Sequence, residues 1–382
     1  MIRQFRIRNY KILRELDLAL GQLTVMVGPN ACGKSSVLRA MTQLCAMKVR
    51  APRDIFTGDE QLDEVVTRGA SEPVSLAASG VTEAAESEPG GVPWALEWRD
   101  RDRDRAVSDP YEREATLQWR FGEQGEEQPR FWMEPLSSID AGLTGAVPTV
   151  AHLHFTFEHL AAPAVITPEP ELTSTGRGLA AVLGHLALQY PADFIRIKEA
   201  ALSVISSIKD IRLRNTLTLA NPPRTRSLAR SGRRSEDERT EVPAHELLFD
   251  THSGSDIPAH AMSDGTLRVL GLLTVALGRT PPQMILLDDL ERGVHPRAMI
   301  DLVSLLRRSL QENLDLQVVA STHSPDLLDQ LEPEQIRLLW IGDDGYTRCV
   351  AMPEHPDYAA WQAIMTPGEM WGVFDRDREA AS

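Results

Sequence analysis

A stretch near the start of the chain has the residue types and spacing of a phosphate-binding loop. Residues 25–36 read VMVGPNACGKSS, and Gly28, Gly33, Lys34 and Ser35 match the pattern G-x-x-x-x-G-K-[ST]. In such a loop, closely spaced backbone N–H groups surround an anion. Only five lysines occur in the whole chain, so its composition makes a chance match improbable. The motif predicts that a nucleotide binds here.

The segments on either side of the loop are those that the motif needs. The apolar run Leu23–Val27 predicts a buried strand, and Lys34–Met47 has helical spacing with Val37, Leu38 and Met41 on one face. A strand, a loop and a helix in this order place the N–H groups of the loop at a helix N-terminus, which attracts phosphate. A glycine-rich turn without a nucleotide is the alternative, and this context argues against it.

Three later segments add groups of the kind that phosphoryl transfer uses. Residues 263–266 (SDGT) open a predicted helix. Further on, the apolar strand MILL ends in Asp288 and Asp289, and a strand predicted at 316–322 ends in His323. Carboxylates can hold Mg²⁺ or orient a water molecule, and a histidine can contact a phosphate.

The composition limits the classes of protein to consider. The chain of 382 residues, with 42% hydrophobic and 25% charged residues, has the composition of a soluble globular protein of one to three domains. Its net charge of −15 argues against DNA binding over the whole surface and suits a protein partner equally well. No apolar run predicts a membrane span or a signal peptide. Three cysteines without a C-x-x-C pair favour the cytoplasm.

The rest of the chain alternates between strand-like and helical stretches. Strands are predicted over 2–8 and 15–20. Strand-like pieces within 51–149 alternate with Gly, Pro and Glu clusters, which indicates antiparallel hairpins. Helical spacing follows over 178–207, with a strand over 210–219.

Two histidines fall in a strand predicted over 151–158 (AHLHFTFE). His152, His154 and Glu158 would share one face of that strand, so a metal site is one interpretation. Their spacing matches no standard zinc pattern. The alternation with apolar residues also fits a half-buried strand. We favour structural or solvated histidines.

Two charged runs also have two interpretations each. Residues 99–105 (RDRDRDR) fit a solvated hairpin tip better than a specific contact. The segment 222–240 is predicted to be a mobile loop that either orders on nucleic acid or is merely solvated, and we favour the second. Its arginines are Arg224, Arg226, Arg230, Arg233 and Arg234.

In this order the four segments resemble the ATP-binding-cassette (ABC) class of ATPases, specifically its soluble SMC, RecF and OLD branch. Within that branch, MSDGTLRVL, ILLDDLERGVHP and ASTHSPDLL are most similar to the bacterial AAA-labelled ATPases related to the OLD proteins. Many of these serve as the ATPase half of phage-defence or toxin systems. The resemblance covers roughly 1–48 and 245–345, more loosely 174–215, and does not reach 51–149.

The resemblance implies an α/β fold of the ABC-type P-loop ATPase head. Such a head has a mixed or parallel sheet with flanking helices and an antiparallel β-subdomain, and here it would carry inserted β-hairpin and helical lobes. We expect a discontinuous head with three further regions. The head would comprise 1–50 and 245–382, followed by an antiparallel β insertion at 51–160, a helical lobe at 161–221 and an arginine-rich mobile loop at 222–240.

The resemblance also gives the loop residues roles in binding ATP. Backbone amides would surround the β-phosphate, and Lys34 would neutralise the β and γ oxygens. Ser35 would coordinate Mg²⁺, and Ser36 would reach the α-phosphate. The loop residues expected to contact ATP are Gly28, Asn30, Ala31, Cys32, Gly33, Lys34, Ser35 and Ser36.

The later motifs receive roles in the same way. Asp288 would hold Mg²⁺ through water. Asp289 stands where the family usually has the glutamate that positions or deprotonates the attacking water, and His323 matches the switch histidine that contacts the γ-phosphate. Ser263 and Gly265 match the signature motif, which completes the site of the opposite subunit, although Ser263 also has the residue type of a plain N-cap.

Three positions depart from the family's pattern. Asp289 is one methylene shorter than glutamate, so we expect slow hydrolysis, with Glu291 either a second candidate base or a helix-entry contact. Ala31 and Cys32 replace the usual Gly-Ala or Gly-Ser, and we favour a passive Cys32 over a reactive thiol. For the glutamine of the Q-loop, Gln61 is only a first candidate.

The expected function follows from the motifs together. OLD nucleases carry a Toprim domain after the ATPase head, whereas here Asp375 and Asp377 form an Asp-x-Asp that fits a charged tail better. We expect an ATP- and Mg²⁺-dependent ATPase that forms a homodimer or higher even oligomer through its ATP sites. It would regulate a separate effector, such as a Toprim or other nuclease or a toxin, in phage defence. The alternatives are a RecF-like repair protein that closes on duplex DNA and a module that binds ATP without turnover.

Overall fold

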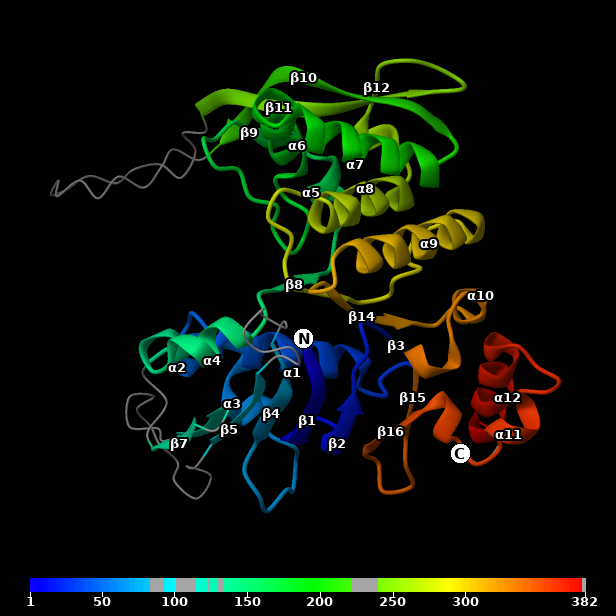
Figure 1. Cartoon of the computed structure of the whole chain (residues 1–382). Helices are drawn as coiled ribbons and strands as arrows, with labels where there is room; N and C mark the ends of the chain where they lie inside the picture. Colours follow the sequence, from blue (N-terminus) through cyan, green and yellow to red (C-terminus); the bar gives the residue numbers. More distant parts are fainter. Residues whose placement is uncertain (83–91, 101–114, 123, 130–133, 221–239, 380–382) are drawn as a thin grey trace, which may run out of the picture. The chain divides into compact units, whose positions relative to one another are not determined.

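The computed structural model describes residues 1–82, 92–100, 115–122, 124–129, 134–220 and 240–379 (Figure 1). The chain divides into two compact units that draw on interleaved stretches of sequence. The first unit comprises residues 1–153, 282–292 and 303–382, and the second comprises 154–281 and 293–302. The positions 101–105 and 222–239 of the two charged runs lie outside the described residues.

The first unit is built on a six-stranded, mostly parallel sheet. Its strands are β3 (Leu23–Val27), β8 (Val150–Leu153), β13 (Met284–Leu287), β14 (Gln317–Thr322), β15 (Ile336–Ile341) and β16 (Thr347–Ala351). They are ordered β16-β15-β3-β14-β13-β8, and only β16 runs antiparallel to its neighbour. The C-terminal ends of β3, β13 and β14 therefore lie at one edge, where α/β sheets bind ligands.

A second, antiparallel sheet belongs to the same unit. Its order is β2-β1-β4-β5-β6-β7, and every pairing in it is antiparallel, as the sequence predicts for the hairpins. The strands are β1 (Ile2–Tyr10), β2 (Leu13–Ala19), β4 (Ser75–Val81), β5 (Pro93–Asp100), β6 (Ala115–Phe121) and β7 (Gln124–Pro129).

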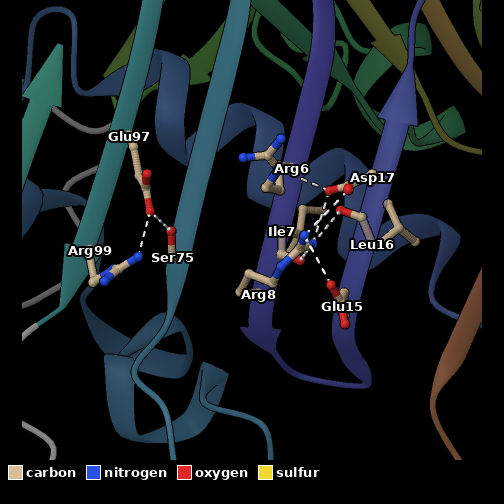
Figure 2. A network of polar contacts seen from close by, with 9 residues as sticks. All are labelled: Arg6, Ile7, Arg8, Glu15, Leu16, Asp17, Ser75, Glu97 and Arg99. Atoms are coloured by element: carbon tan, nitrogen blue, oxygen red, sulfur yellow. Dashed lines mark hydrogen bonds and ion pairs between the residues drawn. The ribbon is translucent and has the colours of Figure 1, made fainter.

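One face of the antiparallel sheet is polar and carries cross-strand charge pairs (Figure 2). Arg6 and Arg8 of β1 both contact Asp17 of β2, at 3.2 and 3.0 Å. On β5, Glu97 accepts a hydrogen bond of 2.8 Å from Ser75 of β4. The two arginine–aspartate pairs are at least partly exposed, so each contributes at most about 1 kcal/mol. They keep this face outward, which leaves the opposite face to supply the core.

Helix α1 (Lys34–Ala46) packs against both sheets. Its Val37 and Leu38 are fully buried in one apolar cluster with Phe5 of the antiparallel sheet and with Met26 and Val319 of the parallel sheet. Because α1 starts at the end of the phosphate loop, this packing fixes the position of the loop.

Further helices complete the first unit. They are α2 (Pro52–Ile55), α3 (Leu62–Val65), α4 (Ala141–Ala146), α10 (Pro325–Leu328), α11 (Tyr358–Trp361) and α12 (Pro367–Glu379). The longest helix of the described residues, α9 (Pro296–Glu312), starts in the second unit and ends in the first. None of the helices described here has the length and apolar character that a membrane span needs.

The second unit packs helices on a small antiparallel sheet. Its strands are β9 (Ala164–Val165), β10 (Ile208–Ala220), β11 (Thr240–Thr251) and β12 (Ile257–Pro258). Its helices are α5 (Phe157–Ala161), α6 (Leu179–Gln189), α7 (Pro191–Val204) and α8 (Asp264–Ala276). Helix α6 contacts β11, and α7 contacts both β10 and α8. The helical spacing over 178–207 thus corresponds to α6 and α7.

The strand predicted over 151–158 is wrong beyond Leu153. There β8 ends, and the amide of His154 donates to the Ser174 carbonyl at 2.9 Å, which turns the chain out of the sheet. Helix α5 then starts at Phe157, so His152, His154 and Glu158 do not share a strand face. No group of three potential metal ligands occurs among the described residues. In addition, β8 is a parallel strand of the core sheet, although it lies within the range expected to form the antiparallel insertion.

Candidate nucleotide site

The phosphate loop connects β3 to α1 with the geometry of an anion site. Gly33, the N-cap of α1, has a φ of 102°, and Ala31 has a φ of 62°. No side chain caps α1, and its first turn contains no acidic residue. The N–H groups at this end therefore have no partner among the side chains of the helix's own first turn, and the helix dipole favours a bound anion.

Gly28 and Cys32 lie behind the loop and pack against the sheet. A Cβ atom at Gly28 would collide with the Leu339 carbonyl oxygen and with the Cys32 thiol, so only glycine fits there. Cys32 is completely buried, and that burial raises the pKa of its thiol. Its carbonyl accepts a hydrogen bond of 2.8 Å from the Thr347 hydroxyl. These contacts support a packing role for Cys32, because a buried thiol is a poor nucleophile.

Lys34 folds back over the loop. Its Nζ donates to the carbonyl oxygens of Gly28 and Pro29 at 2.7 and 2.9 Å, and the residue is only 6% exposed. The ammonium group is therefore held over the loop by backbone dipoles. A bound phosphate would offer it a stronger, charged acceptor.

A cavity of about 360 Å³ opens at this loop. Asp289 and His323 reach it from the ends of β13 and β14, next to the loop residues that the motif predicts. The whole lining belongs to the first unit. It consists of Lys11, Ile12, Asn30, Ala31, Gly33, Lys34, Ser35, Ser36, Asp289 and His323.

Lys11 and Ile12 are lining residues that we did not identify from the sequence. Lys11 lies in the tight turn between β1 and β2 with a φ of 53°, and burial together with the charge of Arg39 lowers its pKa. A cation beside the loop adds to the positive potential that attracts a phosphate. The signal in the sequence is that one of only five lysines stands in a predicted turn close to the start of the chain, one strand before the strand that leads into the loop.

Ser321 joins the two aspartates at the end of β13. Its hydroxyl donates to Asp288 Oδ1 at 2.6 Å and accepts from the Asp289 amide at 2.9 Å. Asp289 has a φ of 51°, which costs a non-glycine residue on the order of 1 kcal/mol. The strained turn directs Asp289 into the cavity, whereas Asp288 is not among the lining residues.

The surroundings of Asp289 make its carboxylate more basic than usual. Burial raises its pKa, and the negative charges of Asp288 and Glu291 raise it further. His323 and Lys34 act in the opposite direction without cancelling this effect. A carboxylate with a raised pKa is better suited to accept a proton from water.

Glu291 lies close by but does not line the cavity. Its Oε2 accepts a hydrogen bond of 2.7 Å from the Thr322 hydroxyl, and its Oε1 accepts one of 2.6 Å from the His323 amide. Glu291 is thus bound to the end of β14.

The signature residues lie in the second unit. Ser263 caps α8 by accepting a hydrogen bond of 3.2 Å from the Thr266 amide. A Cβ atom at Gly265 would collide with the Gly293 carbonyl of the same unit. These local roles account for both residue types, and their part in nucleotide binding stays a prediction. Gln61, the Q-loop candidate, is exposed at the start of α3 and is not a lining residue.

The donor set at the loop fits magnesium and a nucleotide. Magnesium prefers oxygen ligands, and the Ser35 hydroxyl and the Asp288 carboxylate are of that kind. The uncapped start of α1 and the Lys34 ammonium suit phosphate oxygens.

Known proteins match both ends of this arrangement. The family described as "AAA ATPase domain" matches residues 1–78, and the family described as "AAA domain, putative AbiEii toxin, Type IV TA system" matches residues 161–329. The OLD nuclease of Thermus scotoductus (strain ATCC 700910 / SA-01) is 44% identical over 41 residues, which are 11% of this chain and 8% of that protein. The solved SMC head bound to the C-winged helix domain of ScpA is 14% identical, with a TM-score of 0.52 and coverage of 91% of this chain and 97% of that one. Two stretches of the chain thus match AAA ATPase families, and its fold is similar to that of an SMC head.

The chain has the mixed α/β fold of an ABC-type ATPase head, with parallel and antiparallel sheets, as the sequence predicts. The resemblance drawn from the motifs is confirmed at that level. A further SMC head, from Pyrococcus furiosus with an extended coiled coil and bound to the C-terminal domain of ScpA, is 11% identical. It covers 99% of each chain at a TM-score of 0.46.

Proposed function

We propose that this chain binds ATP and Mg²⁺ at the phosphate loop and hydrolyses ATP slowly. The observation that carries the proposal is that Lys34, the uncapped start of α1, and the side chains of Asp289 and His323 all face one cavity. Phosphoryl transfer needs little else from a protein than positive charge and an oriented water. When bound, Mg²⁺ would neutralise charge on the phosphate oxygens, held by Ser35 directly and by Asp288 through water.

Asp289 would orient the attacking water and accept its proton. His323, at the end of the neighbouring strand, would donate a hydrogen bond to the γ-phosphate. Because aspartate is one methylene shorter than glutamate, its carboxylate would stand farther from the water. A misplacement of about 1 Å costs roughly a hundredfold in rate, which is why hydrolysis is proposed to be slow.

A second copy of the chain would complete the site. In the motif resemblance, Ser263 and Gly265 bind the nucleotide of the opposite subunit, and the described cavity is lined by the first unit alone. We therefore propose a homodimer, or a higher even oligomer, that forms through the ATP sites. The head, β insertion and helical lobe named above are proposed as its parts.

The proposed biological role is that of a sensor or regulator in bacterial phage defence, acting in the cytoplasm on a separate effector. Support comes from the match of residues 161–329 to the family whose description includes an AbiEii toxin, and from the short match to an OLD nuclease. A nuclease, of the Toprim or another type, or a toxin would be the effector.

Phosphate release and light scattering with size-exclusion chromatography test the ATPase and its assembly. Wild type should release phosphate from ATP and gain mass with ATP and Mg²⁺, and Lys34→Ala should do neither. Lys209→Ala, at an exposed lysine of β10, is the matched control and should behave as wild type. A monomer at every ATP and protein concentration would contradict the proposed assembly.

A RecF-like repair function is the second candidate, because the fold is that of an SMC head. It predicts ATP-dependent binding of duplex DNA with a steep salt dependence. Charge reversal at Arg224, Arg226, Arg230, Arg233 and Arg234 should abolish that binding. Failure of wild type to bind duplex DNA with ATP would remove this candidate.

A further inference from the structure

Glu291 differs from the other acidic residues near the cavity in the number of hydrogen bonds that its carboxylate accepts. Asp289 faces the cavity, whereas both oxygens of Glu291 bind the end of β14. The bonds measure 2.7 Å from the Thr322 hydroxyl and 2.6 Å from the His323 amide. Bonds of this length to a carboxylate are about twice as strong as neutral ones.

The same network extends to the residue after His323. The Thr322 hydroxyl donates to Glu291 and accepts a hydrogen bond of 3.0 Å from the Ser324 amide. Ser324 in turn caps α10, through the amide of Leu327. Glu291 thus holds the backbone on which the His323 side chain stands, and α10 fixes that backbone from the other side.

This placement argues against Glu291 as a general base. A base must lie within hydrogen-bonding reach of the water that it deprotonates. Glu291 does not line the cavity, and accepting a proton would weaken its two bonds to β14.

We propose that Glu291 is a positioning residue that holds His323 against the γ-phosphate position and takes no proton from water. The inference rests on the proposed ATPase function. It adds that hydrogen bonds accepted by Glu291, in the turn after β13, fix the backbone at the end of β14, where His323 lies.

Two substitutions separate positioning from base catalysis. Glu291→Gln keeps the shape: its Oε1 can accept from the His323 amide and its Nε2 can donate to the Thr322 hydroxyl oxygen, but an amide is no base. Glu291→Ala removes both contacts. For a positioning residue, we expect kcat of Glu291→Gln to stay within about threefold of wild type and that of Glu291→Ala to fall roughly a hundredfold. KM should change little in either, because Glu291 does not line the cavity.

A third variant sharpens the test. Thr322→Val, at a completely buried position, removes one of the two bonds and should give an intermediate kcat. Equal loss of kcat in Glu291→Gln and Glu291→Ala would overturn the proposal.

Hydrogen exchange of the His323 amide measures the positioning without relying on hydrolysis. Exchange should be slow in wild type and in Glu291→Gln and fast in Glu291→Ala, with melting temperatures showing that each variant is folded. Unchanged exchange in a folded Glu291→Ala would overturn the inference. Absence of wild-type phosphate release would instead contradict the proposed ATPase function, so the two failures are distinguishable.

Discussion

The imidazole Nε2 of His323 lies 3.8 Å from the carboxylate Oδ1 of Asp289. The two residues follow neighbouring parallel strands, β14 and β13, in which Leu287 pairs with Ala320. Their separation is beyond hydrogen-bonding distance, and both side chains are partly exposed at the cavity. Each therefore keeps its polar atoms available to a ligand.

The fall of kcat at acidic pH should reflect the protonation of Asp289. The residue acts as a base only when ionised, and burial with the neighbouring negative charges raises its pKa above 3.8. We expect kcat to rise with pH to a plateau, with a midpoint above the usual aspartate value. Asp289→Asn should remove the activity, whereas Asp301→Asn, at an exposed position of α9, should keep the profile. A midpoint at or below 3.8 would contradict this role.

The same raised pKa has a consequence for stability. The folded state binds the Asp289 proton more tightly than the unfolded state does. This contribution to stability is present below pH 3.8 and is lost as the pH rises through the raised folded pKa. Asparagine carries no charge and tolerates a φ of 51°. The melting temperature of Asp289→Asn should exceed that of wild type at neutral pH and converge with it in acid. A lower value at neutral pH would be evidence against the shift.

Lengthening the side chain at position 289 should increase turnover. Asp289→Glu brings the carboxylate one methylene closer to the water. Because a misplacement of about 1 Å costs roughly a hundredfold in rate, we expect kcat to rise about tenfold. Single-turnover phosphate release measures the chemical step directly. A slower Asp289→Glu would mean that the strained turn already places the shorter side chain correctly.

A pair of glycine substitutions tests the packing behind the loop. Gly28→Ala would force a Cβ atom against the Leu339 carbonyl and the Cys32 thiol, which should cost about 1–3 kcal/mol and lower ATP affinity. Gly372→Ala, in α12, meets no atom within 4 Å and should stabilise by about 0.5–1 kcal/mol. Urea unfolding and nucleotide titration measure both, and equal stabilities would refute the packing argument.

Substituting a second helix N-cap as a control separates the two roles of Ser263, helix capping and nucleotide binding. Ser263→Ala and Asp140→Ala each remove a helix N-cap, at α8 and α4, and each should cost about 1 kcal/mol. Only Ser263→Ala should also reduce ATP-dependent assembly, measured by light scattering. If both variants assemble like wild type, Ser263 is a cap and nothing more.

The local elements of the site could be predicted from sequence. The strand before the loop is β3 without change, the predicted helix Lys34–Met47 is α1 with one residue fewer, and the strand ending at Asp288 is β13. Short apolar runs, a glycine loop and helical spacing are local patterns, so no knowledge of distant contacts is needed.

Other features of the fold and of the site could not be predicted, because they depend on which strands become neighbours. The sequence predicts a longer strand where the structure has the four-residue β8, because the partner of β8, β13, comes far later in the chain. The role of Ser321 as a bridge between Asp288 and Asp289, and the approach of Lys11 to the loop, likewise arise only when distant segments pack. Spacing along a sequence does not encode such contacts.

The place of β3 in its sheet also constrains synthesis. Both of its neighbours come late, since β3 ends at residue 27 and β14 and β15 begin at residues 317 and 336. At about 5–20 residues per second, a ribosome needs roughly 15–60 s for that interval. A nascent chain therefore carries the phosphate-loop sequence long before it can bind a nucleotide, while β1 and β2 can already pair. The strand that carries the loop gains both of its neighbours in the sheet only once β14 and β15 have been synthesised.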